Sequence, residues 1–175
     1  MKGMRTMLKS GGKNEKNFIN AHKNHFMKAC FFALAFFVIA GDQLSKNWIV
    51  RQFEPGDSWP LITGIFHLTY VRNPGAAFGV LAFRSSFFII ISLLMIFLII
   101  YGERFFPKNN FSLRLAMSLL LGGAIGNLID RMRYGYVIDF FDFFIWPVFN
   151  VADIALVVGV FSLVYGLYKN RDFIF

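Results

Sequence analysis

Apolar residues gather into four long runs along this chain, separated by polar and charged segments. The runs are Ala29–Gly41, Phe87–Gly102, Leu115–Gly126 and Ile154–Tyr168. A helix needs roughly 20 residues to cross the hydrocarbon core of a membrane, so each run must extend into its polar neighbours. We therefore predict four membrane-spanning helices, at about residues 27–49, 85–102, 112–130 and 150–168.

Residues 50–84, between the first two predicted helices, follow a different pattern and are too long for a hairpin connection. Residues 61–72 are rich in isoleucine, threonine, phenylalanine, tyrosine and valine, and they lie between Pro60 and the turn residues Asn73-Pro-Gly75. This composition predicts β-structure with a turn, and residues 136–141 are a candidate for a further strand. Because exposed strand edges cannot lie in hydrocarbon, this part must lie on the outer surface or cap the helices.

Residues 1–27 are polar and basic, and we predict a disordered tail there, followed by one membrane domain over residues 28–175. A basic tail before an apolar run is also typical of a cleavable signal peptide. However, no small-x-small cleavage site ends the first run, and residues 42–46 continue it with helical spacing. We therefore interpret the first run as a permanent helix.

Composition supports lipid as the solvent of this protein. Of its 175 residues, 57% are hydrophobic, 24 are phenylalanine and only 16% are charged, more apolar surface than a soluble domain of this size could bury. The net charge of +8 could suggest a nucleic-acid partner, but most of this charge flanks the apolar runs and forms no basic face. Anionic membrane lipid explains it better, and we expect no nucleic-acid binding.

The positions of lysine and arginine predict the orientation in the membrane. Four spans put both termini on one side, and 12 of the 18 basic residues fall on that side. Segments rich in lysine and arginine next to a membrane span usually stay on the cytoplasmic side, so both termini should be cytoplasmic. Trp48, Trp59 and Trp146 then lie near the outer boundary, where interfacial tryptophans concentrate. We expect a multi-pass membrane protein, present as a monomer.

Polar residues that are distant in sequence converge near that outer boundary. Asp42 and Lys46 end the first helix four residues apart, so they share a helix face and can pair. The other members come from the later helices and the outer segments: Asn73, Asn127, Asp130, Arg131, Asp139, Asn150 and Asp153. Ionisable groups within a membrane are costly and are functional by default. Taken alone, Asp42 and Lys46 could be an ordinary ion pair at the membrane interface. The polar residues of the third helix, Asn127, Asp130 and Arg131, could be a buried polar contact that joins two helices.

The chain lacks the residues of a metal site. It has one cysteine, Cys30, and three histidines, and none of these has the spacing of metal ligands. We expect neither a metal nor another cofactor. A Ser-His-Asp triad is poorly supported because only His67 lies in an outer segment, although a serine with Lys46 as its base is possible in principle.

Paired carboxylates are the chemistry for which the outer side is best equipped. Two neighbouring carboxylates share a proton, so one can activate water while the other protonates the leaving group. Asp153 lies in the first turn of the fourth helix, a favourable place for an anion. Its partner could be Asp139, Asp130 or, less favourably, Asp142, and the spacing does not decide among them.

At these same residues the chain resembles the lipoprotein signal peptidases, also called signal peptidase II, an aspartic peptidase family. Five matching blocks, which span about residues 29–168, occur in the family's order: Asp42-Gln-Leu-Ser-Lys46, Arg72-Asn-Pro-Gly-Ala-Ala-Phe78, Gly122-Gly-Ala-Ile-Gly-Asn-Leu-Ile-Asp-Arg131, Val137-Ile-Asp-Phe140 and Phe149-Asn-Val-Ala-Asp153. Five ordered blocks are a far stronger signal than any one of them.

The resemblance implies a catalytic dyad of Asp139 and Asp153. It gives supporting roles to Asp42, Lys46, Asn73, Asn127, Asp130, Arg131 and Asn150. The implied fold is an all-α membrane bundle of four transmembrane helices with a small extracytoplasmic β cradle. The implied substrate is a prolipoprotein whose lipobox cysteine carries a diacylglyceryl group, cut just before that cysteine to release the signal peptide.

Two other classes of function remain open on the residues alone. A small proton-coupled transporter could use intramembrane aspartates as a relay, but carriers place such groups near the midplane between repeats, and no repeat is visible here. A non-enzymatic assembly or lipid-binding protein would not need two convergent aspartates. Cleavage of a purified lipid-modified precursor by the purified protein discriminates among the three.

Overall fold

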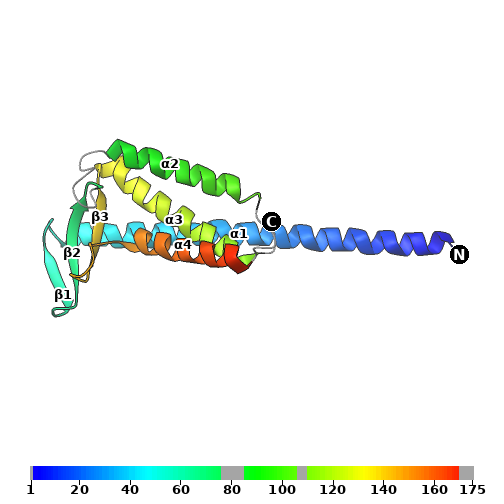
Figure 1. Ribbon diagram of the computed structural model, residues 1–175, viewed down its shortest axis with the longest axis horizontal. Helices are drawn as coiled ribbons and strands as arrows, with labels where there is room; N and C mark the ends of the chain where they lie inside the picture. Colours follow the sequence, from blue (N-terminus) through cyan, green and yellow to red (C-terminus); the bar gives the residue numbers. More distant parts are fainter. Residues whose placement is uncertain (1, 76–84, 106–109, 170–175) are drawn as a thin grey trace.

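Four helices and three strands make up the part of the chain that the computed structural model describes, which is residues 2–75, 85–105 and 110–169. They follow one another as α1 (Lys2–Gln52), β1 (Ser58–Ile62), β2 (Phe66–Asn73), α2 (Ser85–Gly102), α3 (Phe111–Tyr134), β3 (Val137–Asp142) and α4 (Val151–Lys169). The helices form a bundle, and the small sheet closes one end of it (Figure 1). The predicted fold class is confirmed.

Each helix contains a stretch that is long and apolar enough to cross a membrane. These stretches are His25–Gln52, Ser85–Gly102, Phe111–Tyr134 and Val151–Lys169. All four spans predicted from the apolar runs are present, with ends within about four residues of the expected ones, apart from the start of α1. The protein is therefore a membrane protein.

The start of α1 differs most from the predicted bounds. We expected this helix to begin at about residue 27, after a disordered tail, whereas the helix begins at Lys2. No proline interrupts residues 2–27, so nothing in the backbone stops a helix from propagating out of the apolar span. The boundary between a tail at 1–27 and a membrane domain at 28–175 stays a prediction.

Local signals explain where α3 begins and ends. The side chain of Asn110 caps its first turn by accepting a hydrogen bond from the amide of Leu113. Gly135 ends it in the left-handed conformation at φ 77°, and its N–H donates to the carbonyl of Arg131. The helix therefore runs four residues past the predicted end, as far as Tyr134.

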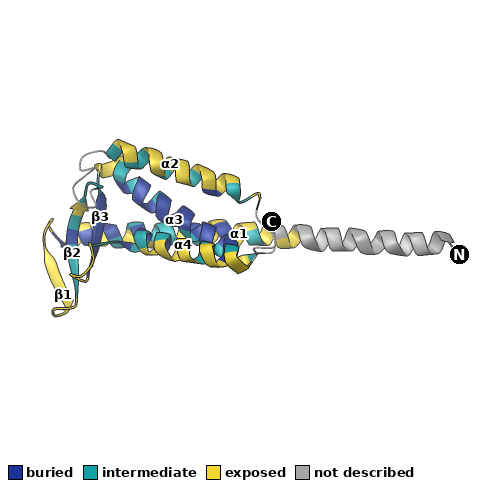
Figure 2. Ribbon diagram, viewed as in Figure 1, coloured by how far each residue is buried: buried dark blue, intermediate teal, exposed yellow. Residues whose placement is uncertain are grey.

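The third helix is the centre of the bundle and the most buried of the four helices (Figure 2). Glycines let its neighbours approach closely: a Cβ on Gly122 would lie 2.7 Å from Cβ of Val38 on α1, and one on Gly123 would lie 2.5 Å from the carbonyl oxygen of Ala152 on α4. Such small residues matter in lipid, where burial of apolar surface does not drive helices together. α2, by contrast, exposes most of its large apolar side chains.

The antiparallel sheet has the strand order β1-β2-β3. In the register of β2 and β3, Val71 lies opposite Asp139. A core cluster joins the sheet to the end of α1 through Ile49, Phe53, Tyr70, Ile138 and Phe140. This cluster fixes β3 against the bundle, and the predicted strand at 136–141 is observed one residue later, at Val137–Asp142.

The chain returns from β3 to the bundle through one further backbone pairing. Phe149 and Phe141 form an isolated antiparallel bridge, with N···O distances of 3.1 and 2.8 Å. Because α4 begins at Val151, this bridge holds its first turn beside β3. The strand and the helix start can therefore each present a carboxylate to the same place.

Candidate active site

Asp139 lies in the middle of β3 and is buried. Each of its carboxylate oxygens accepts a hydrogen bond from an asparagine amide: Nδ2 of Asn150 lies 2.6 Å from Oδ1, and Nδ2 of Asn73 lies 2.8 Å from Oδ2. Asn73 ends β2, the neighbouring strand, and Asn150 directly precedes α4. Two elements on either side of β3 therefore orient this carboxyl group.

Asp153 lies in the first turn of α4, where it forms a reciprocal cap with Asn150. The amide of Asn150 donates to Oδ2 of Asp153 at 3.2 Å, and the amide of Asp153 donates to Oδ1 of Asn150 at 2.9 Å. Nδ2 of Asn127, on α3, donates to Oδ1 of Asp153 at 2.8 Å. Asn150 therefore bonds to both aspartates and holds the two carboxyl groups as neighbours.

The pKa of Asp139 is raised from 3.8 to about 6. Burial is the largest cause, and the negative charge of Asp153 is the second. The hydrogen bonds from Asn73 and Asn150 and the charge of Lys46 act in the opposite direction. A carboxyl group that keeps its proton beside a second carboxylate is the arrangement that acid–base hydrolysis needs.

Lys46 organises a buried network behind the two aspartates. Its Nζ lies 2.8 Å from Oδ2 of Asp42, 2.9 Å from Oδ2 of Asp130 and 3.1 Å from Oδ1 of Asn127. These four side chains are almost fully buried, so each charge needs the partners that the others supply. Because the amide of Ala152 donates to Oδ1 of Asp42 at 2.9 Å, the network also fixes the start of α4.

Asp130 connects α3 to two other elements. Its Oδ2 accepts a hydrogen bond of 3.1 Å from the amide of Ile138, the residue before Asp139 on β3. Its Oδ1 accepts a hydrogen bond of 2.9 Å from Nε2 of Gln43 on α1. Sequence reasoning missed Gln43, which also donates to Oδ2 of Asp42 and to the carbonyl of Gly126. The signal was available, because Gln43 stands three residues before Lys46 and so shares its helix face.

Arg131 lies near the site without bonding to either aspartate of the proposed pair in the described structure. Its Nη1 lies 3.4 Å from the carbonyl of Asn127, and its guanidinium lies over the ring of Phe88 on α2 at 5.2 Å. Its positive charge nevertheless interacts favourably with Asp139 and Asp153. All nine predicted site residues thus gather at the sheet end of the bundle, and Arg131 lies at the edge of the group.

Geometry separates the three candidate partners of Asp153. Both oxygens of Asp130 are occupied by α1 and β3. Asp142 bonds instead to the hydroxyl of Thr69 at 2.8 Å and to the amide of Phe144 at 2.9 Å. Of these three candidates, only Asp139 forms a hydrogen bond with Asn150, the residue that also forms hydrogen bonds with Asp153.

Known proteins show the same architecture. The sequence model of the family described as Signal peptidase (SPase) II matches residues 34–169. The chain belongs to the signal peptidase II family. One relative, the lipoprotein signal peptidase of Moorella thermoacetica, is 52% identical over 137 residues, which cover 78% of this chain and 91% of that protein. Another, from Streptococcus pyogenes serotype M2, is 45% identical over 150 residues, which cover 84% of this chain and 99% of that protein.

Solved structures agree with this membership. A bacterial membrane enzyme determined at 1.9 Å resolution superimposes with a TM-score of 0.75 at 35% identity, over 81% of this chain and 94% of that chain. A second, at 2.3 Å resolution, gives a TM-score of 0.74 over 82% and 90% of the two chains. This signal peptidase II is therefore a membrane aspartic peptidase, and the transporter alternative is not favoured.

Two features of this peptidase bear on its reaction. Where the structure defines side chains, no group of three or more His, Cys, Asp or Glu residues could hold a metal ion. A pocket of about 350 Å³ adjoins Asp153, and its walls are otherwise apolar, formed by Trp146, Phe149, Ile154, Val157 and Val158. An apolar chain can therefore lie directly beside one of the two carboxylates.

Proposed function

We propose that this protein releases signal peptides from diacylglyceryl-modified bacterial prolipoproteins, with Asp139 and Asp153 as its catalytic dyad. The observation that carries the proposal is the shared contact of Asn150 with both aspartates, which come from β3 and α4. The peptidase activity follows from the family. The assignment of the dyad rests on this geometry and on the raised pKa of Asp139.

The two carboxyl groups divide the work of hydrolysis. Burial and the charge of Asp153 favour the protonated form of Asp139, so we assign Asp139 as the acid and Asp153 as the base. Asp153 takes a proton from water as the water oxygen attacks the scissile carbonyl carbon. Asp139 gives its proton to the carbonyl oxygen, which forms a tetrahedral intermediate. Collapse of that intermediate breaks the C–N bond, and the proton held by Asp153 goes to the leaving amine. As the carbonyl re-forms, one hydroxyl group of the intermediate returns its proton to Asp139. Asp139 is then protonated and Asp153 ionised, as at the start.

The asparagines serve this reaction by fixing the acids. The side-chain amides of three asparagines each donate a hydrogen bond to one of the two carboxyl groups: Asn73, Asn127 and Asn150. A group held in this way loses little orientational freedom when substrate binds, and such preorganisation supplies a large share of the rate in enzymes. Lys46, Asp42 and Asp130 hold α1, α3 and the start of α4 together, so we assign them a structural role.

The apolar pocket beside Asp153 explains why the substrate should carry lipid. Its walls offer apolar side chains to an acyl chain or an apolar signal helix, while Asp153 lies at its edge. A lipid anchor also confines the scissile bond to the membrane boundary, which leaves little recognition to the sequence around it. With both termini cytoplasmic, the site faces the outer side of the inner membrane.

Cleavage of a defined substrate by the purified protein tests this proposal. The probe is a synthetic prolipoprotein peptide with a diacylglyceryl group on its lipobox cysteine, presented in detergent micelles. We expect two products, one of which begins with the lipidated cysteine, and at least a tenfold lower kcat/KM for the same peptide without lipid. Equal cleavage of both peptides, or a cut at another bond, would contradict the proposed specificity.

A further inference from the structure

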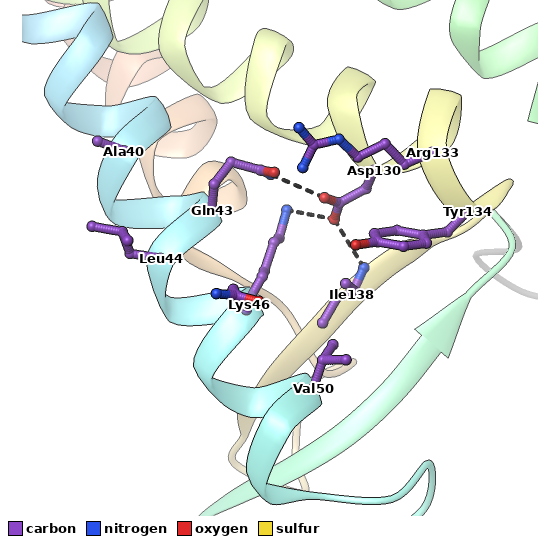
Figure 3. Close-up of a pocket in the computed structure, with 10 residues that line it drawn as sticks. Ala40, Gln43, Leu44, Lys46, Val50, Asp130, Arg133, Tyr134 and Ile138 are labelled. Atoms are coloured by element: carbon purple, nitrogen blue, oxygen red, sulfur yellow. Dashed lines mark hydrogen bonds and ion pairs between the residues drawn. The ribbon is translucent and has the colours of Figure 1, made fainter.

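A second pocket, of about 460 Å³, opens between α1 and α3 at the sheet end of the bundle. Its described lining includes neither Asp139 nor Asp153, and its floor is the buried pair of Lys46 and Asp130 (Figure 3). The proposed reaction makes no use of this space. The side chains around it show which kind of ligand it could take.

One wall of the pocket carries a positively charged side chain, that of Arg133. Arg133, in the last turn of α3, extends its guanidinium group over Gln43 and Asp130 (Figure 3). The carboxylate below it is already occupied by Lys46, Gln43 and the amide of Ile138. Within the described residues Arg133 therefore forms neither an ion pair nor a hydrogen bond, and its charge favours an anionic ligand.

The remaining walls combine neutral polar groups with lipid-facing apolar groups. Asn47 contributes an amide, and the hydroxyl of Tyr134 points into the pocket. Leu44 and Val50 line it from α1 and are 69% and 40% exposed on a helix that spans the membrane. An occupant therefore meets a polar, positively charged end and an apolar side that faces hydrocarbon.

The depth of the pocket matches that of lipid headgroups. The span of α1 ends at Gln52 and that of α3 at Tyr134, so the pocket lies at the boundary between the apolar span and the sheet. Arginine and tyrosine at this depth commonly contact lipid headgroups. Among the described lining residues Lys46 and Asp130 pair with each other, which leaves Arg133 as the excess positive charge of the lining.

We propose that this pocket binds the phosphodiester headgroup of a membrane phospholipid. Arg133 pairs with the phosphate, Asn47 and Tyr134 donate to its oxygens, and an acyl chain lies along the face of α1 at Leu44. A lipid in this position covers the Lys46–Asp130 pair and braces α1 against α3. The proposal rests on the position of the pocket in the membrane and stands whether or not Asp139 and Asp153 form the dyad.

Native mass spectrometry of the delipidated protein in detergent tests this site, with dioctanoyl phosphatidylglycerol as the probe. We expect one saturable adduct on the wild-type protein. Arg133→Gln should weaken its affinity about tenfold or more, since it removes a charge-assisted pair. Arg51→Gln is the matched control, because Arg51 is an exposed arginine near the same end of α1 that does not line the pocket.

Further arms of the experiment identify the source of the phosphate and protect against a variant that fails to fold. Dioctanoylglycerol, which lacks phosphate, and glycerol phosphate, which lacks acyl chains, should both bind at least tenfold more weakly. If Arg133→Gln is not recovered folded, Leu44→Trp, which fills the apolar side without changing charge, should weaken the adduct instead. Unchanged binding in the recovered variant, an equal loss in Arg51→Gln, or tight binding of glycerol phosphate overturns the proposal.

Discussion

Asp139 illustrates how neighbouring residues set the chemistry of a single carboxyl group. Its burial and the charge of Asp153 raise its pKa, while two asparagine amides and Lys46 limit the rise. Because a raised pKa means that the neutral form is favoured, the proton stays on Asp139 until the pH approaches about 6. Substrate that excludes water from the site would favour the neutral form further.

Infrared spectroscopy of the substrate-free protein tests this protonation. The band of a protonated aspartic acid should disappear as the pH rises through about 6 in the wild-type protein, and Asp139→Asn should lack it. In Asp153→Asn the negative neighbour is gone, so the same band should disappear at a lower pH. Loss of the wild-type band near the ordinary aspartate pKa of about 3.9 would show that burial does not act on Asp139 as we infer.

Sequence reasoning recovered these residues better than their contacts. The aspartates could be found because ionisable groups at helix ends stand out in an apolar chain. Their pairing could not, since Asp139 and Asp153 meet only through the register of β3 and the bridge between Phe141 and Phe149. Gln43 could be placed on the helix face of Lys46, but only the packing of α3 against α1 shows that its amide reaches Asp130.

At the scale of elements, helix approach decides whether the site is assembled. α4 carries Asp153, and its first turn packs against Gly123 and Gly126 of α3. A Cβ on Gly126 would lie 2.7 Å from Oδ2 of Asp42 and 3.2 Å from Cβ of Ala152. The packing of these small residues therefore links the fold of the bundle directly to the position of Asp153, the base of the proposed dyad.

Gly123→Ala tests this link. The new methyl group would lie 2.5 Å from the backbone oxygen of Ala152, which cannot move without shifting α4. We expect a loss of roughly 1–3 kcal/mol in stability, typical of overpacking, and at least a tenfold fall in turnover, measured by thermal unfolding and cleavage in detergent. Gly41→Ala is the control, because its Cβ would meet nothing within 4 Å. Equal behaviour of the two variants would contradict the packing argument.

The helices themselves were predictable from the apolar runs and the length that a membrane span requires, because a span must satisfy its own backbone hydrogen bonds. The strands were located less well. The prediction placed β-structure at residues 61–72, whereas β1 covers Ser58–Ile62 and β2 covers Phe66–Asn73, with Gly64 in the turn between them at φ 75°. β1 is exposed along its whole length, so it lacks the alternation of buried and exposed residues that reveals a half-buried strand.

For the whole molecule, the bundle with a sheet at one end creates a polar site at the boundary of the membrane. The sheet contributes Asp139 and Asn73, and the other polar groups come from the helices near the sheet and from Asn150, just before α4. Much of α2 and α4 is exposed, as Figure 2 shows, and the exposed side chains include many large apolar residues that suit contact with lipid. A peptidase built in this way meets its substrate where an apolar anchor ends and a soluble chain begins.

Reporter fusions test the orientation that this account requires. A reporter placed at residue 175 should report the cytoplasm, and one placed in the turn at Asp57 should report the opposite side. The reason is the distribution of basic residues, since 12 of the 18 fall on the side of the termini. Reporters that indicate the same side would contradict the four-span topology, and exchanged sides would place the site at the inner face.

The most direct test of the central claim is the turnover of lipidated substrate by purified Asp139→Asn and Asp153→Asn, normalised to folded protein. Asparagine keeps the shape but cannot transfer the proton, and acid–base catalysis contributes about 10²–10⁴ in rate per group. Each variant should therefore lose nearly all activity, with the double variant scarcely worse. The control is Asp130→Asn, which should reduce the yield of folded protein at least as much as its rate. Substantial activity of Asp139→Asn, together with folded but inactive Asp130→Asn, would contradict the assignment and make Asp130 the partner of Asp153.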